Sequence, residues 1–445
     1  MNRTLRKALP ALAALGMLGA CDGMLDVENP TLVTPEVVEG KEEMLAPFVL
    51  GIESRFRQGY AWMASSGASA TDEAVFGHVW SPWNEYDRRK VTPDGGATAT
   101  GYPFVTATIA TGELYTQEIE KLVGANAASS PALAGALAYT GFGWLQGAQH
   151  HCELVVDGTR GPVGRAYARA IERLTRAAQV GAAAGPEGKH WVNLANVGIA
   201  RAHLDQGNRS QAIEFARKVD PEFAAWVRYS AHTDFFNWQF YNLYARTAGL
   251  KSPVEFNQGI GPTDAKKLLV RPVAGQPGRL TWDRRVPFQA DSLSLLMGGW
   301  SLPRYAYVPF SPSSFSGWNP DNPRLIRDDE DIRFASGLEA RYIIAEASLN
   351  GGAGGWTQAQ VLQFVNERRA VGGLPAFSGG DLFRELREQK KLDFYFAGYR
   401  FPDLRRYLER YGINEFPSGA LDGFTGAAPE TYGTETCWPL PPIEV

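Results

Sequence analysis

Two adjacent helical patterns joined by a short turn constrain the fold of this chain more than any other feature of its sequence. Residues 193–219 read NLANVGIARAHLDQGNRSQAIEFARKV, and apolar residues recur in it at steps of three and four. The first run ends at about Leu204, and the second extends from about Arg209 to Val219. Gly207 and the asparagine after it interrupt the pattern, as turn residues do. The segment is therefore predicted to form a hairpin of two antiparallel helices.

The small residues of this hairpin resemble those of a tetratricopeptide repeat. Ala200, Gly207 and Ala212 fall where two antiparallel helices can approach closely only if no bulky side chain lies between them. The segment 339–352, EARYIIAEASLNGG, shows the same seven-residue step between small residues, and 357–373 provides a partner helix. A strict 34-residue repeat is absent, so a regular solenoid is not expected.

Helices dominate the remaining pattern, and the connections between them are long. Residues 165–183 carry one largely apolar stripe at helical spacing. Three segments rich in Gly, Pro, Ser and aromatic residues separate the helical parts: 75–103, 251–290 and 298–330. We therefore predict an all-α, predominantly helical fold of tetratricopeptide-like hairpins with a large loop-rich remainder.

The first 21 residues have the features of a lipoprotein signal. A basic start is followed by the apolar run 8–20, which is shorter than the ~20 residues that span a bilayer. The sequence LGAC, ending at Cys21, resembles the bacterial lipobox, in which the cysteine thiol receives a diacylglycerol and its freed amine an acyl chain such as palmitate. We expect a cleaved signal peptide over 1–20, a lipidated tether over 21–35 and a single domain over 36–445. The alternative is a secreted protein with a coincidental cysteine.

The composition argues against nucleic acid as a partner. The chain has 44 basic and 48 acidic residues, and the signal peptide contains three of the basic ones and no acidic one. Its removal leaves 41 against 48, a net charge of about −7. Nucleic-acid binding needs a cationic surface, which this balance does not favour.

The two remaining cysteines are candidates for a disulfide. Cys152 and Cys437 would lie in an oxidising compartment if the chain is exported. A bridge between them would fasten the C-terminal tail to the middle of the chain. Two buried free thiols are the alternative, and the sequence leaves both open.

Aromatic residues in the long loops are the candidates for ligand binding. Aromatic rings stack on the apolar faces of sugar rings, and neighbouring Asn, Asp and Arg side chains reach the hydroxyl groups; packing in the core is the alternative for each ring. The segments VWSPWNEYDRR and SGWNPDN place tryptophan beside Asn and Asp in turn-like sequence, where a ring is expected to be exposed. The candidate ligand-binding residues are Trp80, Trp83, Asn84, Tyr86, Trp300, Trp318 and Asn319.

Taken in order, the motifs resemble the SusD/RagB family of outer-membrane nutrient-binding lipoproteins. Besides the lipobox and the hairpin at 193–219, they include ASATDEAV (68–75), RYIIAEASLNGG and FVNERRAVGGLPAF. The most specific is ELREQKKLDFYFAGYRFPDLRRY (385–407), followed by the terminal CWPLPPIEV. The resemblance covers nearly the whole chain, but the loops diverge, so it assigns no ligand residues.

The resemblance implies both a fold and a function. The fold would contain four tetratricopeptide-like hairpins, and the protein would have no enzymatic activity and no cofactor. It would be lipid-anchored at the outer membrane and exposed at the cell surface. It would lie over a SusC-like TonB-dependent transporter, to which it delivers a captured glycan or peptide. A glycan-degrading surface enzyme and a protein-binding scaffold remain as alternatives.

Three clusters could suggest other chemistry. The acidic run at 327–334, RDDEDIRF, could bind calcium, but we expect it to precede a helix whose dipole favours acidic residues. His150 and His151 are adjacent, so they point about 100° apart on a helix; a helix end is expected there and no metal site. Whether calcium assists ligand binding stays open. Six charged residues of the C-terminal motif could also suggest an acid/base site, but we expect them to be structural. They are Glu388, Asp393, Arg400, Asp403, Arg405 and Arg406.

Overall fold

The structure is a computed structural model. Cys21 and the segments expected to be signal peptide and tether lie outside the described residues. The structure describes residues 42–71, 73, 85–230, 252–253, 271–273, 276–281, 283–286, 288–291, 296–297, 300–301, 306–309, 311–322, 324, 326–327, 329–419 and 431–442.

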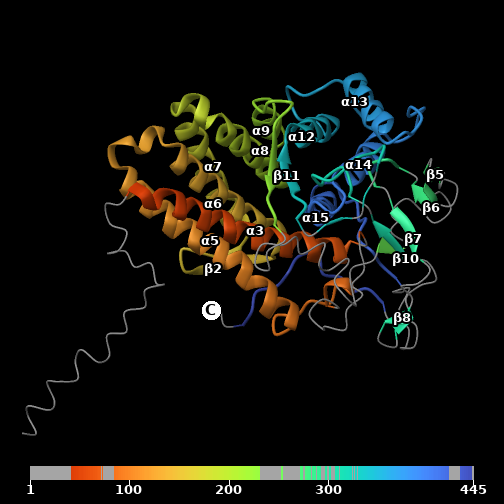
Figure 1. The fold of residues 1–445 in the computed structure, drawn as a ribbon, viewed down its shortest axis with the longest axis horizontal. Helices are drawn as coiled ribbons and strands as arrows, with labels where there is room; N and C mark the ends of the chain where they lie inside the picture. The colour runs from red at the N-terminus through yellow and green to blue at the C-terminus, as the bar shows by residue number, and fades with distance from the viewer. Residues whose placement is uncertain are drawn as a thin grey trace, which may run out of the picture. The chain divides into compact units, whose positions relative to one another are not determined.

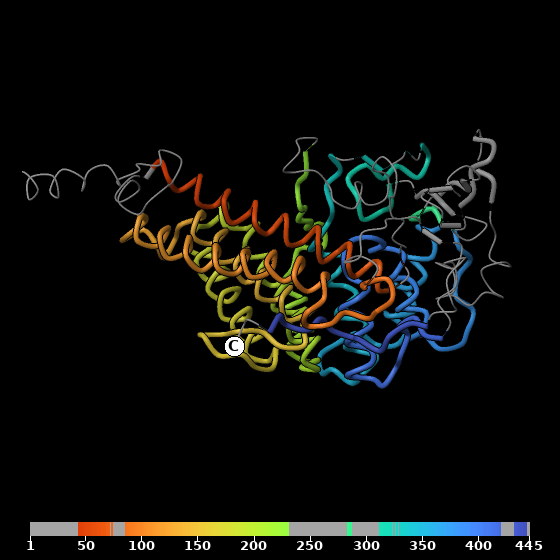
Figure 2. Tube along the Cα trace, turned by 90° about the horizontal axis from the view of Figure 1, so that it is seen from below, coloured from red at the N-terminus to blue at the C-terminus, as the bar shows by residue number. Residues whose placement is uncertain are grey.

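Helices form most of the described fold, as predicted, and consecutive helices pack against one another (Figure 1). In Figure 2 the red α3 and the orange α5 lie side by side, and the two are in contact. The first group consists of α3 (Leu45–Ala70), α5 (Gly96–Val123), α6 (Pro131–His150), α7 (Gly164–Ala183), α8 (Lys189–Asp205) and α9 (Arg209–Ala216). The second consists of α12 (Gly337–Leu349), α13 (Gln358–Val371), α14 (Leu382–Asp393) and α15 (Arg400–Tyr411). Short 3₁₀ helices are η1 (Glu42–Met44), η2 (Gly124–Ser129) and η3 (Gly185–Gly188).

The hairpin predicted over 193–219 is confirmed as α8 and α9. Gly207 has φ +81°, a conformation that L side chains rarely adopt, which explains the glycine at the turn. Close helix packing also depends on small residues elsewhere. A Cβ atom at Gly112 of α5 would lie 2.7 Å from Thr140 Oγ1 of α6, so only glycine allows this approach without a shift. The apolar stripe predicted over 165–183 lies on α7, where Tyr167, Ala170, Leu174 and Ala177 are buried.

The described strands are short and pair antiparallel. β1 (Glu153–Val156) and β2 (Thr159–Pro162) form a hairpin, and β3 (Ala224–Val227) pairs with β11 (Ile332–Ser336). The loop-rich segment contains a five-stranded sheet and a separate pair. The sheet order is β4 (Ser252–Pro253), β10 (Ala306–Pro309), β7 (Phe288–Asp291), β6 (Gln276–Thr281) and β5 (Arg271–Val273); the pair is β8 (Leu296–Met297) with β9 (Trp300–Ser301).

Two local expectations were wrong. Residues 96–103 were assigned to a long loop, but they form the first two turns of α5. Pro103 lies inside this helix and cannot donate the hydrogen bond to the carbonyl of residue 99. The acidic run was expected to precede a helix, but Asp329, Glu330 and Asp331 precede strand β11 instead. The helix that follows β11 is capped by Ser336, whose side chain accepts a hydrogen bond from the Glu339 N–H.

The end of α6 agrees with the prediction at the histidine pair. The helix ends at His150, and both histidines are buried. Burial lowers the pKa of His150 to about 4 and that of His151 to about 3, so both are neutral near pH 7. Within the described part of the chain, none of the helices is both long and apolar enough to cross a membrane.

Candidate functional site

The structure places only some of the candidate ligand-binding residues. Trp80, Trp83 and Asn84 lie outside the described residues, and Trp300 is placed only as a member of β9. Of the others, Tyr86 is buried, whereas Trp318 is half-buried and Asn319 exposed.

Tyr86 is a core residue, which corrects the expectation of a ligand contact there. Its side chain is 1% exposed, and its hydroxyl donates a hydrogen bond to the Ala97 carbonyl at 2.9 Å. Its ring packs edge-to-face on Trp438, with centroids 4.9 Å apart. Burial raises the pKa of the phenol well above its ordinary value. A ring enclosed in this way has no face to offer a ligand, because the apolar C-terminal tail covers it.

Trp318 lies in a turn whose backbone is fixed by local hydrogen bonds. Its main-chain N–H donates to the Phe315 carbonyl at 3.2 Å. Its indole Nε1 donates to the Arg284 carbonyl at 3.0 Å, which satisfies the polar atom of the ring and fixes its orientation. Asn319 Oδ1 accepts hydrogen bonds from the main-chain N–H groups of Asp321 and Asn322, both at 3.0 Å. This is the side-chain-to-backbone pattern that shapes Asx turns.

An exposed ion pair lies beside the ring. Arg284 Nη2 donates to Asp321 Oδ1 at 2.6 Å, and both side chains are open to solvent. We call Arg284, Trp318, Asn319 and Asp321 the Trp318 surface. It combines a half-buried aromatic ring with a guanidinium, an amide and a carboxylate, which can exchange hydrogen bonds with a polar ligand. Asp321 belongs to the SGWNPDN motif and could have been chosen from sequence, whereas nothing local in the sequence singles out Arg284.

The backbone beneath this surface is tied to the centre of the fold. The Ser313 N–H donates to the Arg285 carbonyl at 2.9 Å, and the Arg333 N–H donates to the Ser314 carbonyl at 2.9 Å. The Ser314 hydroxyl donates to the Tyr395 carbonyl in the segment between α14 and α15. These bonds join the turn to β11 and to the FYFAGYR motif.

Arg285 holds the same region in place from its buried side. It is fully buried; its Nη2 donates to Asp283 Oδ2 and to Gln389 Oε1, each at 2.7 Å, and its Nη1 lies 3.1 Å from Asp393 Oδ1. Arg368 donates to both carboxylate oxygens of Asp393, each at 2.8 Å. Burial by itself would raise the pKa of Asp393, but the two guanidinium groups outweigh it and lower the pKa to about 2. Asp393 is therefore ionised. Its ion pair with Arg285 holds the backbone next to the Arg284 carbonyl in place.

The residues considered for an acid/base site form buried ion pairs. Arg406 donates to both carboxylate oxygens of Glu346, at 2.7 and 2.9 Å, and to Asp205 and Asp403, at 2.9 and 2.6 Å. Lys390 binds Asp403 at 2.7 Å. These contacts join α15 to α8, α12 and α14. The described contacts are those of a packed core, in which the charged groups face each other.

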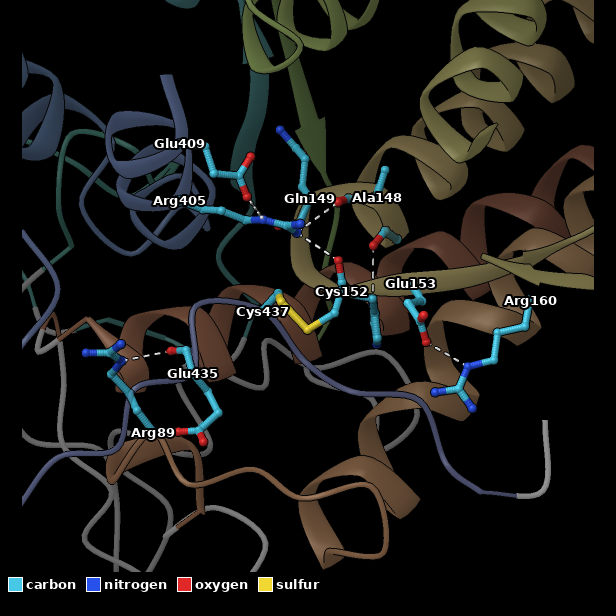
Figure 3. Close-up of a disulfide and its surroundings, with 12 residues drawn as sticks. Arg89, Ala148, Gln149, Cys152, Glu153, Arg160, Arg405, Glu409, Glu435 and Cys437 are labelled. Atoms are coloured by element: carbon cyan, nitrogen blue, oxygen red, sulfur yellow. Dashed lines mark hydrogen bonds and ion pairs between the residues drawn. A yellow bond between two sulfur atoms is a disulfide. The ribbon is translucent and has the colours of Figure 1, made fainter. Parts of the chain in front are cut away.

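The other members of that set are also engaged. Lys391 pairs with Glu388 at 3.0 Å, and Arg400 pairs with Glu415 at 3.3 Å. Arg405 Nη1 donates to the carbonyls of three residues at the end of α6, where a cation offsets the helix dipole (Figure 3). The described residues contain no group of three or more His, Cys, Asp or Glu side chains suited to a metal ion.

The C-terminal tail is fastened to the end of α6 by a disulfide. Cys152 and Cys437 are bonded, with Cα atoms 5.0 Å apart (Figure 3). The Cys152 N–H donates to the Trp438 carbonyl at 2.9 Å, and the Trp438 N–H donates to the His150 carbonyl at 2.7 Å. The Trp438 ring stacks on Phe401 at 4.4 Å. Of the two alternatives left open by the sequence, the structure has the bridge.

Comparisons with known proteins identify the fold. No protein-family model and no curated protein matches the chain. Among solved structures, a SusD-like protein from Bacteroides fragilis has TM-score 0.60 and 14% identity, over 90% of this chain and 92% of that one. A SusD-like carbohydrate binding protein from Bacteroides vulgatus has TM-score 0.56 and 15% identity, over 88% and 89%. A SusD/RagB family protein from Bacteroides thetaiotaomicron has TM-score 0.53 and 13% identity, over 84% and 88%.

Proposed function

From the SusD/RagB fold that this chain has, we propose that it is a non-catalytic, lipid-anchored outer-membrane protein that binds a nutrient glycan. In this proposal it delivers the glycan to a SusC-like TonB-dependent transporter. The fold supports the proposal, since one of the similar solved structures is named as a carbohydrate binding protein. The lipobox at Cys21 supports the anchor, and a tether near a transporter would raise the local ligand concentration without a tight interface.

The Trp318 surface is the main structural support for the proposed binding of a glycan. Its ring is half-buried and oriented through its indole nitrogen, so a face can be presented to a sugar ring without a large loss of side-chain entropy on binding. The exposed Asn319, Asp321 and Arg284 supply donors and acceptors at its edge. The buried ion pairs of Arg285 hold the supporting backbone, as a preorganised site requires.

The test is glycan and peptide binding by the soluble chain 22–445, followed by tryptophan quenching for every hit. Trp318→Ala is expected to weaken a glycan hit roughly tenfold, about 1.4 kcal/mol, with unchanged helical circular dichroism. Trp356→Ala is the matched control, because Trp356 is also half-buried but contacts Phe364 in another part of the fold.

The outcomes separate the three functions. Saturable binding with an intact glycan on chromatography supports the proposal. A shortened glycan would establish the surface enzyme instead. Equal affinities of Trp318→Ala and Trp356→Ala would remove the Trp318 surface from the site, and silence across the array would favour the protein-binding scaffold.

A further inference from the structure

The acidic run at 327–334 contacts the segment that carries Trp318, and the site described above does not use it. We call residues 311–324 the Trp318 loop. Two neighbouring carboxylates of the run differ in burial: Glu330 is 1% exposed, whereas the Asp329 side chain is 35% exposed and forms an ion pair with an exposed arginine. A buried carboxylate needs polar partners, and those partners indicate its role.

The partners of Glu330 come from the two ends of the Trp318 loop. The Ser311 hydroxyl lies 2.6 Å from each carboxylate oxygen of Glu330 and donates its hydrogen bond there. Arg324 Nη2 lies 3.0 Å from Glu330 Oε1. The Ser311 N–H also donates to the Arg324 carbonyl at 2.9 Å. One buried carboxylate therefore holds the start and the end of the loop together.

Gly317, the residue before Trp318, passes directly over this ion pair. A Cβ atom at this position would overlap with Glu330 Oε1 and Arg324 Nη2. Arg324 Nε also donates to the Gly317 carbonyl at 3.4 Å. The glycine in the SGWNPDN motif is thus explained by the close approach of the loop backbone to the carboxylate. The backbone next to the tryptophan is in contact with both members of the pair.

A separate set of contacts fastens the middle of the loop to β11. The Ser316 N–H donates to the Asp331 carbonyl at 3.0 Å, and the Asp331 N–H donates to Ser316 Oγ at 3.0 Å. Phe315 forms an isolated antiparallel bridge with Ile332. None of these contacts uses the Glu330 side chain. A change of that side chain should therefore alter how the loop closes and leave its attachment to β11 in place.

The charges around Glu330 make this closure depend on its ionisation. Burial raises the pKa of Glu330 above its ordinary value, and Asp329 acts in the same direction, whereas Ser311, Arg324 and Arg327 lower the pKa. Protonation would remove the charge that attracts Arg324. Because the pKa is raised, this loss occurs at a higher pH than it would for an exposed glutamate.

We propose that Glu330 is the positioning residue of the Trp318 surface. Its ionised carboxylate closes the loop between Ser311 and Arg324 and thereby fixes the orientation of the Trp318 ring. Loss of that charge, by substitution or by protonation, loosens the loop and weakens ligand binding without unfolding the protein. The effect on binding rests on the proposed function, whereas the orientation of the ring can be measured without any ligand.

Fluorine NMR of the chain 22–445 labelled with fluorotryptophan tests the orientation of the ring. The Trp318 signal is assigned as the one that disappears in Trp318→Phe. In wild type we expect this signal to shift as the pH falls from about 8 to 4, and in Glu330→Gln we expect the acidic position throughout. Asp329→Asn is the matched control, because it removes a carboxylate one residue away, and its signal should follow wild type. A Glu330→Gln signal that coincides with wild type at pH 8 would overturn the proposal.

Gly317→Ala provides a second variant in which every charge of the chain remains. Its methyl group would displace the ends of two flexible side chains, Glu330 and Arg324, so the fold can accommodate it while the ion pair is disturbed. We expect its Trp318 signal at pH 8 to differ from wild type, with unchanged helical circular dichroism. An unaltered signal in the folded variant would contradict the proposal.

Binding by the same proteins separates this inference from the proposed function. The probes are maltohexaose, cellohexaose and laminarihexaose, each titrated by calorimetry. Glu330→Gln should bind roughly fivefold more weakly than wild type at pH 8, and the difference should disappear at acidic pH, where wild type loses the same charge. Equal affinities at pH 8 would overturn the positioning role and leave the glycan-binding function intact. If no probe binds wild type but the fluorine signals respond as expected, the positioning role is supported and the proposed function is weakened.

Discussion

At the scale of single residues, Glu73 is a buried carboxyl group with a raised pKa. Its side chain is 1% exposed, and neither carboxylate oxygen has a hydrogen-bond partner among the described residues. Burial raises its pKa from 4.5 to about 8, against the opposing effect of Arg400 and Lys391. Glu73 is therefore protonated in the folded protein near neutral pH and ionised in the unfolded chain.

This difference predicts a loss of stability with rising pH. Between about pH 4.5 and 8 the folded state holds one more proton at Glu73 than the unfolded state, so the free energy of unfolding falls by roughly 1.4 kcal/mol per pH unit. Glu73→Gln should remove this contribution, and its stability relative to wild type should rise from pH 5 to pH 8. Urea unfolding of both proteins at several pH values measures it. Parallel curves would contradict the assignment.

A second prediction at this scale concerns the anchor. Cys21→Ser removes the thiol that would carry the diacylglycerol, and we expect the variant to lose its membrane attachment. Fractionation of cells, with a high-salt wash and labelling by a radioactive fatty acid, measures it. Retention of an unlabelled, signal-free Cys21→Ser protein in the washed membranes would contradict lipidation as the anchor.

At the scale of elements, the disulfide decides how firmly the C-terminal tail is held. It closes a loop of 285 residues, and the entropy of such a loop in the unfolded chain is large. The double variant Cys152→Ser/Cys437→Ser is expected to lose about 2–5 kcal/mol of unfolding free energy. Chemical unfolding measures this loss, and wild type treated with a reductant provides the comparison.

Without the disulfide, the C-terminal tail should remain partly attached to the end of α6. Trp438 remains buried against Phe401 and Tyr86, and its two backbone hydrogen bonds to 150–152 do not depend on sulfur. We therefore expect faster hydrogen exchange in 431–442 and at the end of α6 in the double variant, with little change in α12. A uniform acceleration of hydrogen exchange throughout the chain would instead mean that the bridge stabilises the fold as a whole and not the tail in particular.

At the scale of the whole molecule, Arg406 joins the parts of the helical core. It is 3% exposed and binds carboxylates from α8, α12 and α15. Arg406→Leu leaves Glu346 and Asp205 buried without their cation, whereas Asp403 keeps Lys390, so we expect a loss of about 3–5 kcal/mol of unfolding free energy. Arg341→Leu is the control, because its pair with Glu367 lies at the surface and should contribute no more than about 1 kcal/mol. Equal effects in urea unfolding would contradict the central role of Arg406.

The sequence by itself determined the helical character of this protein, because helix formation depends on local spacing. The step of small and apolar residues over 193–219 indicated α8 and α9, and Gly207 marked their turn, where the backbone needs positive φ. The charged residues of the 385–407 motif were also expected to be structural, since the segment contains apolar residues to bury, such as Leu386 and Leu392. The resemblance of the ordered motifs to the SusD/RagB family indicated the fold that the solved structures share.

Only the tertiary structure decided which aromatic residues are open to a ligand. Tyr86 and Trp318 both follow turn-like polar sequence, yet the tail carrying Trp438 covers the first and leaves the second half-exposed. The Trp318 indole donates its hydrogen bond to Arg284, which lies 34 residues away in sequence. Arg405 donates to a carbonyl at the end of α6, which lies more than 250 residues away. The exposure of an aromatic ring and the contacts between distant residues both depend on how segments far apart in sequence pack together. No local pattern of residues contains that information.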